Sequence, residues 1–120
     1  MTPTSLDLIL VSADGHTRRT IATLRWPAHL ADQARAFIRD NLLAERVGDS
    51  RRAEAMLRRG RVTAGERAAF LAERPSFLPE PPEALASGMD LEDLVAEFSV
   101  GLSELRTAEA ALDLVFTWKA

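Results

Sequence analysis

The two ends of the chain carry nearly the same pattern, in which large apolar residues alternate with other residues. The pattern occupies Leu6–Val11 near the start and Leu112–Trp118 at the end. A period of two places one row of apolar side chains on one face of a β-strand. Because the residues between the two ends read mainly as helix, we expect an α+β domain in which both ends join one antiparallel sheet.

The first strand is expected to belong to a β-hairpin, with strands at 4–12 and 17–26 around the turn signal Asp14-Gly15. A two-residue loop would place Leu10 opposite Arg19, an apolar side chain opposite a charged one. A three-residue loop pairs apolar residues with one another, and cross-strand pairs of this kind stabilise a sheet. We therefore favour the three-residue loop. Its pairs would be Leu6 with Leu24, Leu8 with Ala22, and Ile9 with Ile21.

The longest helix is expected at 28–46, because apolar residues recur there at helical spacing. Pro27 suits the start of this helix, and Gly48 lies just beyond its end. The apolar stripe consists of Leu30, Ala34, Phe37, Ile38 and Leu42.

Shorter helices are expected in the middle of the chain. Ser50 is expected to cap a helix that runs to Arg59 and stops at Gly60. Thr63 and Glu66 have the spacing of a capping box, which predicts a second helix from residue 64 to about residue 73. Four prolines in 75–82 exclude a regular helix there and predict an extended segment, which Phe77 and Leu78 would anchor to the core.

The last third of the chain contains one further helix and one ambiguous segment. Apolar spacing predicts a helix at 90–98, and alternation predicts the C-terminal strand at 111–118. Residues 98–105 fit a continued helix and a strand equally well. We thus expect residues 1–120 to form a single domain, with a sheet of three or four strands covered on one face by the long helix and the shorter ones.

The amino-acid composition restricts the cellular location and the kinds of chemical site that we expect of this chain. The chain has no cysteine, which excludes disulfides, thiolate metal sites and a cysteine nucleophile together. No run of residues is long and apolar enough for a signal core or a membrane span, so we expect a cytoplasmic protein without a membrane partner. Alanine is abundant and arginine outnumbers lysine 14 to 1, which is typical of GC-rich bacterial or phage genomes.

The sequence offers little that points to catalysis. It contains neither a nucleophile-elbow pattern nor a glycine-rich phosphate loop. His16 and His29 are 13 residues apart, and neither has a partner at the spacing of metal ligands. The acidic residues at 90, 93 and 97 share one helix face, which is typical of a solvated helix start. We predict no catalytic residue, no cofactor and no metal.

Charge is distributed unevenly along the chain. Residues 1–79 carry a net charge of +4, and residues 80–120 carry −7. Seven arginines lie within residues 46–67, across two short helices whose outline is similar to a helix-turn-helix. This cluster is a candidate contact surface for an acidic partner, including the 80–113 segment of another copy, or for nucleic acid. The candidate contact residues are Arg51, Arg52, Arg58, Arg59 and Arg61.

A second candidate surface is the face of the sheet that the helices leave open. Ile9, Val11 and Ile21 would be exposed there and would be covered by a second copy or a partner. Trp26 and Trp118 stand at strand ends and are expected to be neighbours, either as core residues or as interface anchors.

These observations favour a non-catalytic protein-interaction module, a small accessory or assembly protein that binds a protein partner or copies of itself. One alternative is a nucleic-acid-binding regulator that uses the arginines of residues 46–67, although the calculated pI of 5.4 is far from that of a basic domain. A second alternative is a small α+β enzyme or ligand-binding cup, which would need a pocket that holds a histidine beside a buried carboxylate.

Overall fold

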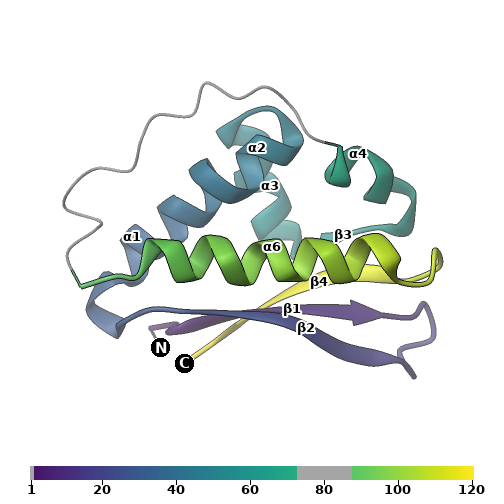
Figure 1. Ribbon diagram of the computed structural model, residues 1–120, viewed down its shortest axis with the longest axis horizontal. Coiled ribbons are helices and arrows are strands. Elements are labelled where there is room, and N and C mark those ends of the chain that lie inside the picture. The colour runs from purple at the N-terminus through teal and green to yellow at the C-terminus, as the bar shows by residue number, and fades with distance from the viewer. Residues whose placement is uncertain (1, 73–87) are drawn as a thin grey trace.

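A computed structural model describes residues 2–72 and 88–120. Four antiparallel strands form one sheet in the order β2-β1-β4-β3, and the helices lie on one side of it (Figure 1). The expected α+β class is confirmed, as is the antiparallel sheet that contains both ends of the chain. The strands are β1 (Ser5–Val11), β2 (Arg18–Arg25), β3 (Arg61–Val62) and β4 (Asp113–Lys119).

The two similar ends of the chain lie side by side. β1 pairs with β4 in a register that places Leu6 opposite Trp118 and Leu8 opposite Phe116. Leu8 and its neighbours in the same row point toward the helices and are almost completely buried. β1 is therefore a central strand, with β2 on one side and β4 on the other.

The pairing of β1 with β2 follows both of the registers that the sequence analysis compared, each over part of the hairpin. Far from the turn, Leu6 lies opposite Leu24 as expected for the three-residue loop. Near the turn, Leu10 lies opposite Arg19, which is the register of the two-residue loop. A β-bulge between Leu8 and Ile9 absorbs the difference, so the expected pairing of Ile9 with Ile21 is wrong. Because the bulge inserts one extra residue into β2, both registers occur in one hairpin, and the Ser12 N–H then bonds to the Thr17 carbonyl at the turn.

Residues 98–105 are helical. They belong to α6 (Leu91–Thr107), whose start is capped by the Asp90 carboxylate. The helix is favoured because its buried side chains recur every three or four residues, whereas a strand would expose half of them. These buried residues are Leu94, Phe98, Gly101, Leu102 and Leu105. The fourth strand of the sheet is instead β3, which pairs with β4.

The long N-terminal helix is continuous over residues 28–47 but changes its winding. A 3₁₀ turn leads into α1 (Ala31–Phe37), a π-helical stretch follows at Ile38–Leu43, and α2 (Ala44–Val47) ends at Gly48 with φ 101°. The wider π-turns bring Leu43 and Ala44 into the core beside Leu42. All five residues of the expected apolar stripe are buried.

The helices in the middle of the chain agree with those predicted from the sequence, except at one N-cap. α3 covers Ser50–Arg59 and ends at Gly60 as expected, but Asp49 rather than Ser50 caps it, by accepting a hydrogen bond from the Arg52 N–H at 2.7 Å. The capping box of Thr63 opens a 3₁₀ turn that continues into α4 (Arg67–Leu71). The expected extended segment at 75–82, with Phe77 and Leu78, lies outside the described residues.

Gly101 sets the distance between α6 and the sheet. A Cβ atom at this position would lie 3.1 Å from the Ala22 Cβ and 3.1 Å from the Leu8 Cδ2. We expect Gly101→Val to destabilise the protein by about 1–3 kcal/mol, because the larger side chain would force the helix and sheet apart. Ser103→Val, on the exposed side of α6, is the matched control and should cost about 0.5 kcal/mol or less. Urea unfolding measures both values, and equal losses would contradict this role of Gly101.

Asp7 is a buried acid on the sheet face opposite the helices. Its carboxylate accepts a hydrogen bond from the Thr23 hydroxyl at 2.9 Å and lies 2.8 Å from the Lys119 Nζ. Burial alone would raise the pKa of Asp7, but the Lys119 and Thr23 hydrogen bonds outweigh it, so the pKa is lowered. The charged form of Asp7 therefore stabilises the fold by linking β1 to both of its neighbours.

This lowered pKa predicts a loss of stability in acid. The contribution of ionised Asp7 to the free energy of unfolding is complete above the unfolded-state pKa of about 3.9. It disappears as pH falls through the lower folded-state pKa. We expect Asp7→Asn to lower the free energy of unfolding by about 1–3 kcal/mol at pH 7, and to flatten its decline below about pH 4. Urea unfolding at several pH values from about 7 down to about 2 tests this, with the exposed Asp32→Asn as control. An unchanged pH slope in Asp7→Asn would refute the assignment.

Candidate functional site

The five arginines singled out in the sequence occupy different environments. Arg51, Arg52 and Arg58 are exposed on α3. Arg52 is 3.6 Å from Asp49 with 70% of its side chain exposed, and Arg58 is 3.8 Å from Glu54 with 77% exposed. Among the described residues Arg51 has no ion-pair partner. Ion pairs this exposed contribute little to stability, so all three guanidinium groups are accessible to a ligand.

Other arginines of the 46–67 cluster hold the fold together. Arg59 donates to the Arg61 carbonyl at 2.8 Å and pairs with Glu66 at 2.9 Å. Arg61 lies on β3, 3.7 Å from the Asp113 carboxylate. Arg67 donates to carbonyls of Leu105, Ala108 and Glu109 at the end of α6. A cation at the C-terminal end of a helix satisfies free carbonyls and complements the helix dipole.

The expected helix-turn-helix outline is wrong. The segment between α3 and α4 contains β3, which joins the sheet beside β4. α4 has only five residues, and its Phe70 is buried in the core. A recognition helix needs an exposed face along several turns, and α4 does not provide one. The cause is the pairing of Arg61 and Val62 with β4, which buries the Val62 side chain in the core.

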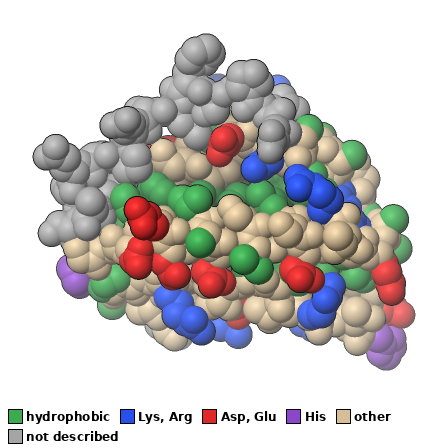
Figure 2. Space-filling view, in the orientation of Figure 1, with side chains coloured by type: hydrophobic (Ala, Val, Ile, Leu, Met, Phe, Trp, Pro, Cys, Tyr) green, Lys and Arg blue, Asp and Glu red, His purple; other side chains and the backbone are tan. Residues whose placement is uncertain are grey.

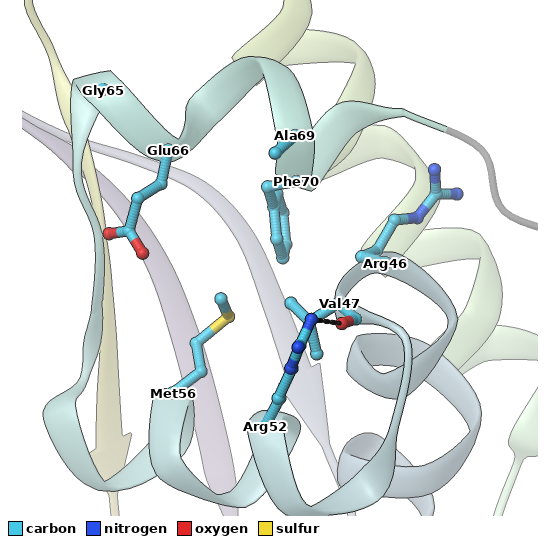
Figure 3. Close-up of a pocket in the computed structure, with 8 residues that line it drawn as sticks. All are labelled: Arg46, Val47, Arg52, Met56, Gly65, Glu66, Ala69 and Phe70. Atoms are coloured by element: carbon cyan, nitrogen blue, oxygen red, sulfur yellow. Dashed lines mark hydrogen bonds between the residues drawn. The ribbon is translucent and has the colours of Figure 1, made fainter.

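A groove separates α3 from α4 (Figure 3). It combines two adjoining hollows of about 320 and 270 Å³ that share Val47, Arg52, Met56 and Glu66. Met56, Glu66 and Phe70 point into the same space, whereas the Arg46 guanidinium points away from it. Arg52 forms one side of the groove, and its NH1 lies 3.5 Å from the Val47 carbonyl oxygen. The groove therefore has an apolar floor and a charged rim.

The rim is positive overall. Glu66 is the acid of this groove, and its charge is engaged by the Thr63 N–H, the Thr63 hydroxyl and Arg59. These contacts, with the Thr63 N–H first, lower the pKa of Glu66 against the opposing effect of burial. Arg52 contributes an exposed cation, and Arg46 hydrogen-bonds weakly to the Leu71 carbonyl at 3.5 Å. A ligand in the groove thus meets an excess of positive charge.

A second cluster of charges joins α1 to α3. Glu54 lies 3.0 Å from Arg35, 3.9 Å from Arg39 and 3.8 Å from Arg58. The Arg35 hydrogen bond lowers the pKa of Glu54, with the charges of all three arginines adding to it. An ionised carboxylate held this way is a structural group and a poor proton donor.

The tryptophans are neighbours, as the sequence predicts. Their ring centroids lie 5.9 Å apart in an edge-to-face arrangement, and Arg35 stacks on the Trp118 ring at 5.1 Å. Trp26 is buried and donates its Nε1–H to the Pro3 carbonyl at 2.9 Å. Trp118 is half-buried and borders a hollow of about 390 Å³ with Pro3 and Arg35. Trp26 is thus a core residue, and Trp118 remains a candidate interface residue.

The expected apolar patch on the open sheet face is absent from the described residues. Ile9 and Val11 lie on that face but are only 6% exposed, because side chains of β2 and β4 flank them on both sides. Ile21 lies at the bulge and joins the core cluster instead. The expectation that these three are exposed is wrong, since neighbouring strands shield the first two and the bulge redirects the third. Their part in an interface stays a prediction.

The described residues offer few other sites. His16 and His29 are both exposed, in the hairpin loop and at the start of the long helix. In residues 2–72 and 88–120 no three His, Asp or Glu side chains are placed to hold a metal ion. No helix in that part of the chain is long and apolar enough to cross a membrane.

Comparisons with known proteins add no functional information. No protein family, no curated protein and no solved structure matches this chain.

The two groups of arginines should differ in their effect on stability. We expect Arg67→Met to lower the free energy of unfolding by about 1–3 kcal/mol, because it removes the donor of the Ala108 carbonyl and a second donor from the Leu105 and Glu109 carbonyls. Arg51→Met, which removes an equally long exposed cation, should change it by less than about 0.5 kcal/mol. Urea unfolding measures both. Equal effects would show that Arg67 is not a structural residue.

Proposed function

We propose that this chain is a non-catalytic protein-interaction module that binds an acidic segment of a partner protein in the groove between α3 and α4. The observation that carries the proposal is the combination of an apolar floor, which contains Met56 and Phe70, with the exposed cation of Arg52. Protein segments that enter such grooves insert apolar side chains and place charges at the rim.

The two parts of the groove contribute differently to binding. Burial of one partner side chain of the size of Leu or Phe contributes about 1.5–3 kcal/mol. Each rim ion pair with an exposed arginine contributes about 0.2–1 kcal/mol. The apolar floor therefore supplies most of the affinity, and the arginines select an acidic segment and accelerate its association.

The nucleic-acid alternative has weaker support. Phosphate binding needs several free cations on one surface, and Arg59 and Arg67 donate to backbone carbonyls within the fold. The net charge of −3 also opposes association with a polyanion. Duplex DNA is nevertheless the natural competitor in a test, because Arg51, Arg52 and Arg58 are exposed.

The enzyme or ligand-cup alternative also has weaker support. It needs a histidine beside a buried carboxylate in a pocket, whereas both histidines are exposed. Asp7, the buried acid of the described residues, is paired with Lys119.

A peptide titration followed by ¹H–¹⁵N NMR tests the proposal. The probe is a synthetic amphipathic peptide with Leu and Phe on one helical face and Glu on the other, matched by a peptide with Lys in place of Glu. We expect the Glu peptide to shift amide signals of Val47, Met56 and Phe70, with a Kd of about 10 µM to 1 mM. The Lys peptide should bind at least about tenfold more weakly, because it is repelled by the arginines.

Variants of the rim provide the control. Arg52→Glu and Ala69→Glu each add negative charge beside the groove at an exposed position, and both should weaken binding of the Glu peptide by about twofold or more. Arg25→Glu makes the same charge change as Arg52→Glu on β2, outside the groove, and should leave binding intact. Equal binding of the Glu and Lys peptides, or shifts outside the groove, would overturn the proposal. Tighter binding of a random duplex through the same signals would favour the nucleic-acid alternative.

A further inference from the structure

β2 is an edge strand whose outer side has no partner strand among the described residues. Hydrogen bonds from the Ser12 N–H to the Thr17 carbonyl and from the Trp26 N–H to the Thr4 carbonyl close its pairing with β1 at both ends. In an antiparallel pair, every second residue directs its N–H and C=O away from the partner strand. Counting inward from the two ends identifies the residues whose backbone groups point outward: Arg18, Thr20, Thr23 and Arg25.

The side chains of these four residues lie on the face of the sheet that the helices leave open. Arg18 is paired there with Val11, and the Thr23 hydroxyl donates to the Asp7 carboxylate. Arg18 and Arg25 are exposed at opposite ends of the strand, and neither makes an ion pair within residues 2–72 and 88–120. On the open face, the edge is therefore positively charged at both ends.

α6 lies over β2 on the other face of the sheet and runs in the opposite direction (Figure 1). Gly101 packs above Ala22 in the middle of β2, and Glu104 is 3.5 Å from Arg19 near its start. The beginning of α6 consequently lies at the Arg25 end of the strand.

The side of α6 nearest this edge is acidic around one exposed valine. Asp93, Glu97, Val100 and Glu104 follow one another at intervals of three or four residues, so they share the side that contacts Arg19. Val100 is 52% exposed. Figure 2 shows acidic side chains gathered along α6 above basic side chains of the sheet. The two faces of the edge thus carry opposite charges.

We propose that the β2 edge binds an extended segment of a partner protein, which adds one strand to the sheet. On the open face the segment carries carboxylates that meet Arg18 and Arg25. On the side of α6 it carries an apolar residue that covers Val100 and a cation that meets Glu97. Backbone hydrogen bonds supply most of the affinity of such an added strand, and the alternating side chains supply its specificity. This surface is separate from the groove between α3 and α4.

The same charges exclude a second copy of β2 as the partner. Pairing of two β2 strands about a twofold axis would bring Arg18 opposite Arg25 on the open face, where no acid of α6 lies beside them. Arginines are a common protection of edge strands against such pairing. Protection explains the arginines, but it does not explain the acids and the exposed valine on the side of α6. Those residues fit the inner side chains of an added strand.

A synthetic peptide with the core Glu-Lys-Thr-Val-Thr-Thr-Glu tests this surface on the whole chain of 120 residues. Its two Glu residues are six positions apart, as are Ser5 and Val11, the β1 residues that pair with Arg25 and Arg18. When the peptide runs antiparallel to β2, it therefore places Glu opposite both arginines, and its Lys and Val lie on the side of α6.

We expect the peptide to shift the amide signals of Thr20 and Thr23 in ¹H–¹⁵N NMR, with a Kd of about 10 µM to 1 mM. Because these N–H groups become hydrogen-bonded, their hydrogen exchange should slow at least about fivefold at a peptide concentration of about ten times the Kd. The N–H of the third peptide residue faces β2, so methylation of that nitrogen should weaken binding at least about fivefold. The N–H of the fourth residue faces away, and its methylation is the matched control, with a loss of about twofold or less.

Charge reversal in the protein provides the second control. Arg18→Glu combined with Arg25→Glu should weaken binding of the peptide about fourfold or more, because two attractions become repulsions. Arg51→Glu combined with Arg58→Glu makes the same charge change on α3 and should leave binding intact. Absence of binding, equal losses from the two methylated peptides, equal effects of the two double variants, or shifts confined to the groove would each overturn the proposal. Circular dichroism of both variants separates loss of binding from loss of the fold.

Discussion

The pairing of β1 on both of its sides is the interaction on which the rest of the structure depends. β1 lies between β2, its neighbour in sequence, and β4, which comes from the other end of the chain. Its buried row faces the helices, and its opposite face contains the Asp7 carboxylate between Thr23 and Lys119. The sheet is thus completed by the last residues of the chain, after every helix that covers it. Within residues 2–72 and 88–120, this order leaves β2 at the edge of the sheet without a second partner strand and leaves one face of the sheet without helices.

The short strand β3 determines where the candidate groove forms. Arg61 and Val62 pair with β4, and Gly60 accepts a hydrogen bond from the Phe116 N–H at 2.9 Å. Because the chain is held to the sheet edge between α3 and α4, the two helices cannot pack against each other as a simple helical hairpin would. Met56 and Phe70 then line the space that remains. The groove is a consequence of strand addition at this edge.

Most of the fold could be predicted from local pattern, and most of the candidate site could not. Alternation identified both ends as strands, and helical spacing identified the long helix, because burial imposes those periods directly. β3 is two residues long, too short for any period to be visible. The bulge near Ile21 lets the hairpin use one register far from the turn and another near it. The sequence argument compared two uniform registers, so it could not predict a hairpin that contains both. The groove is lined by residues as distant in sequence as Val47 and Phe70, with a strand between them. Ile9 is shielded by side chains of two other strands. Neither the groove nor the burial of Ile9 can be predicted from residues that are neighbours in sequence.

The arginines show why composition alone is a poor guide to a binding surface. Arg67 and Arg59 are as charged as Arg52, but backbone carbonyls at a helix end and beside β3 occupy their donors. A guanidinium group has five N–H donors in a fixed plane, so it serves equally well to close a fold and to bind a ligand. Which of the two it does depends on whether free carbonyls lie within its reach. In this chain those carbonyls lie at the end of α6, where Arg67 reaches them, and on β3, where Arg59 does.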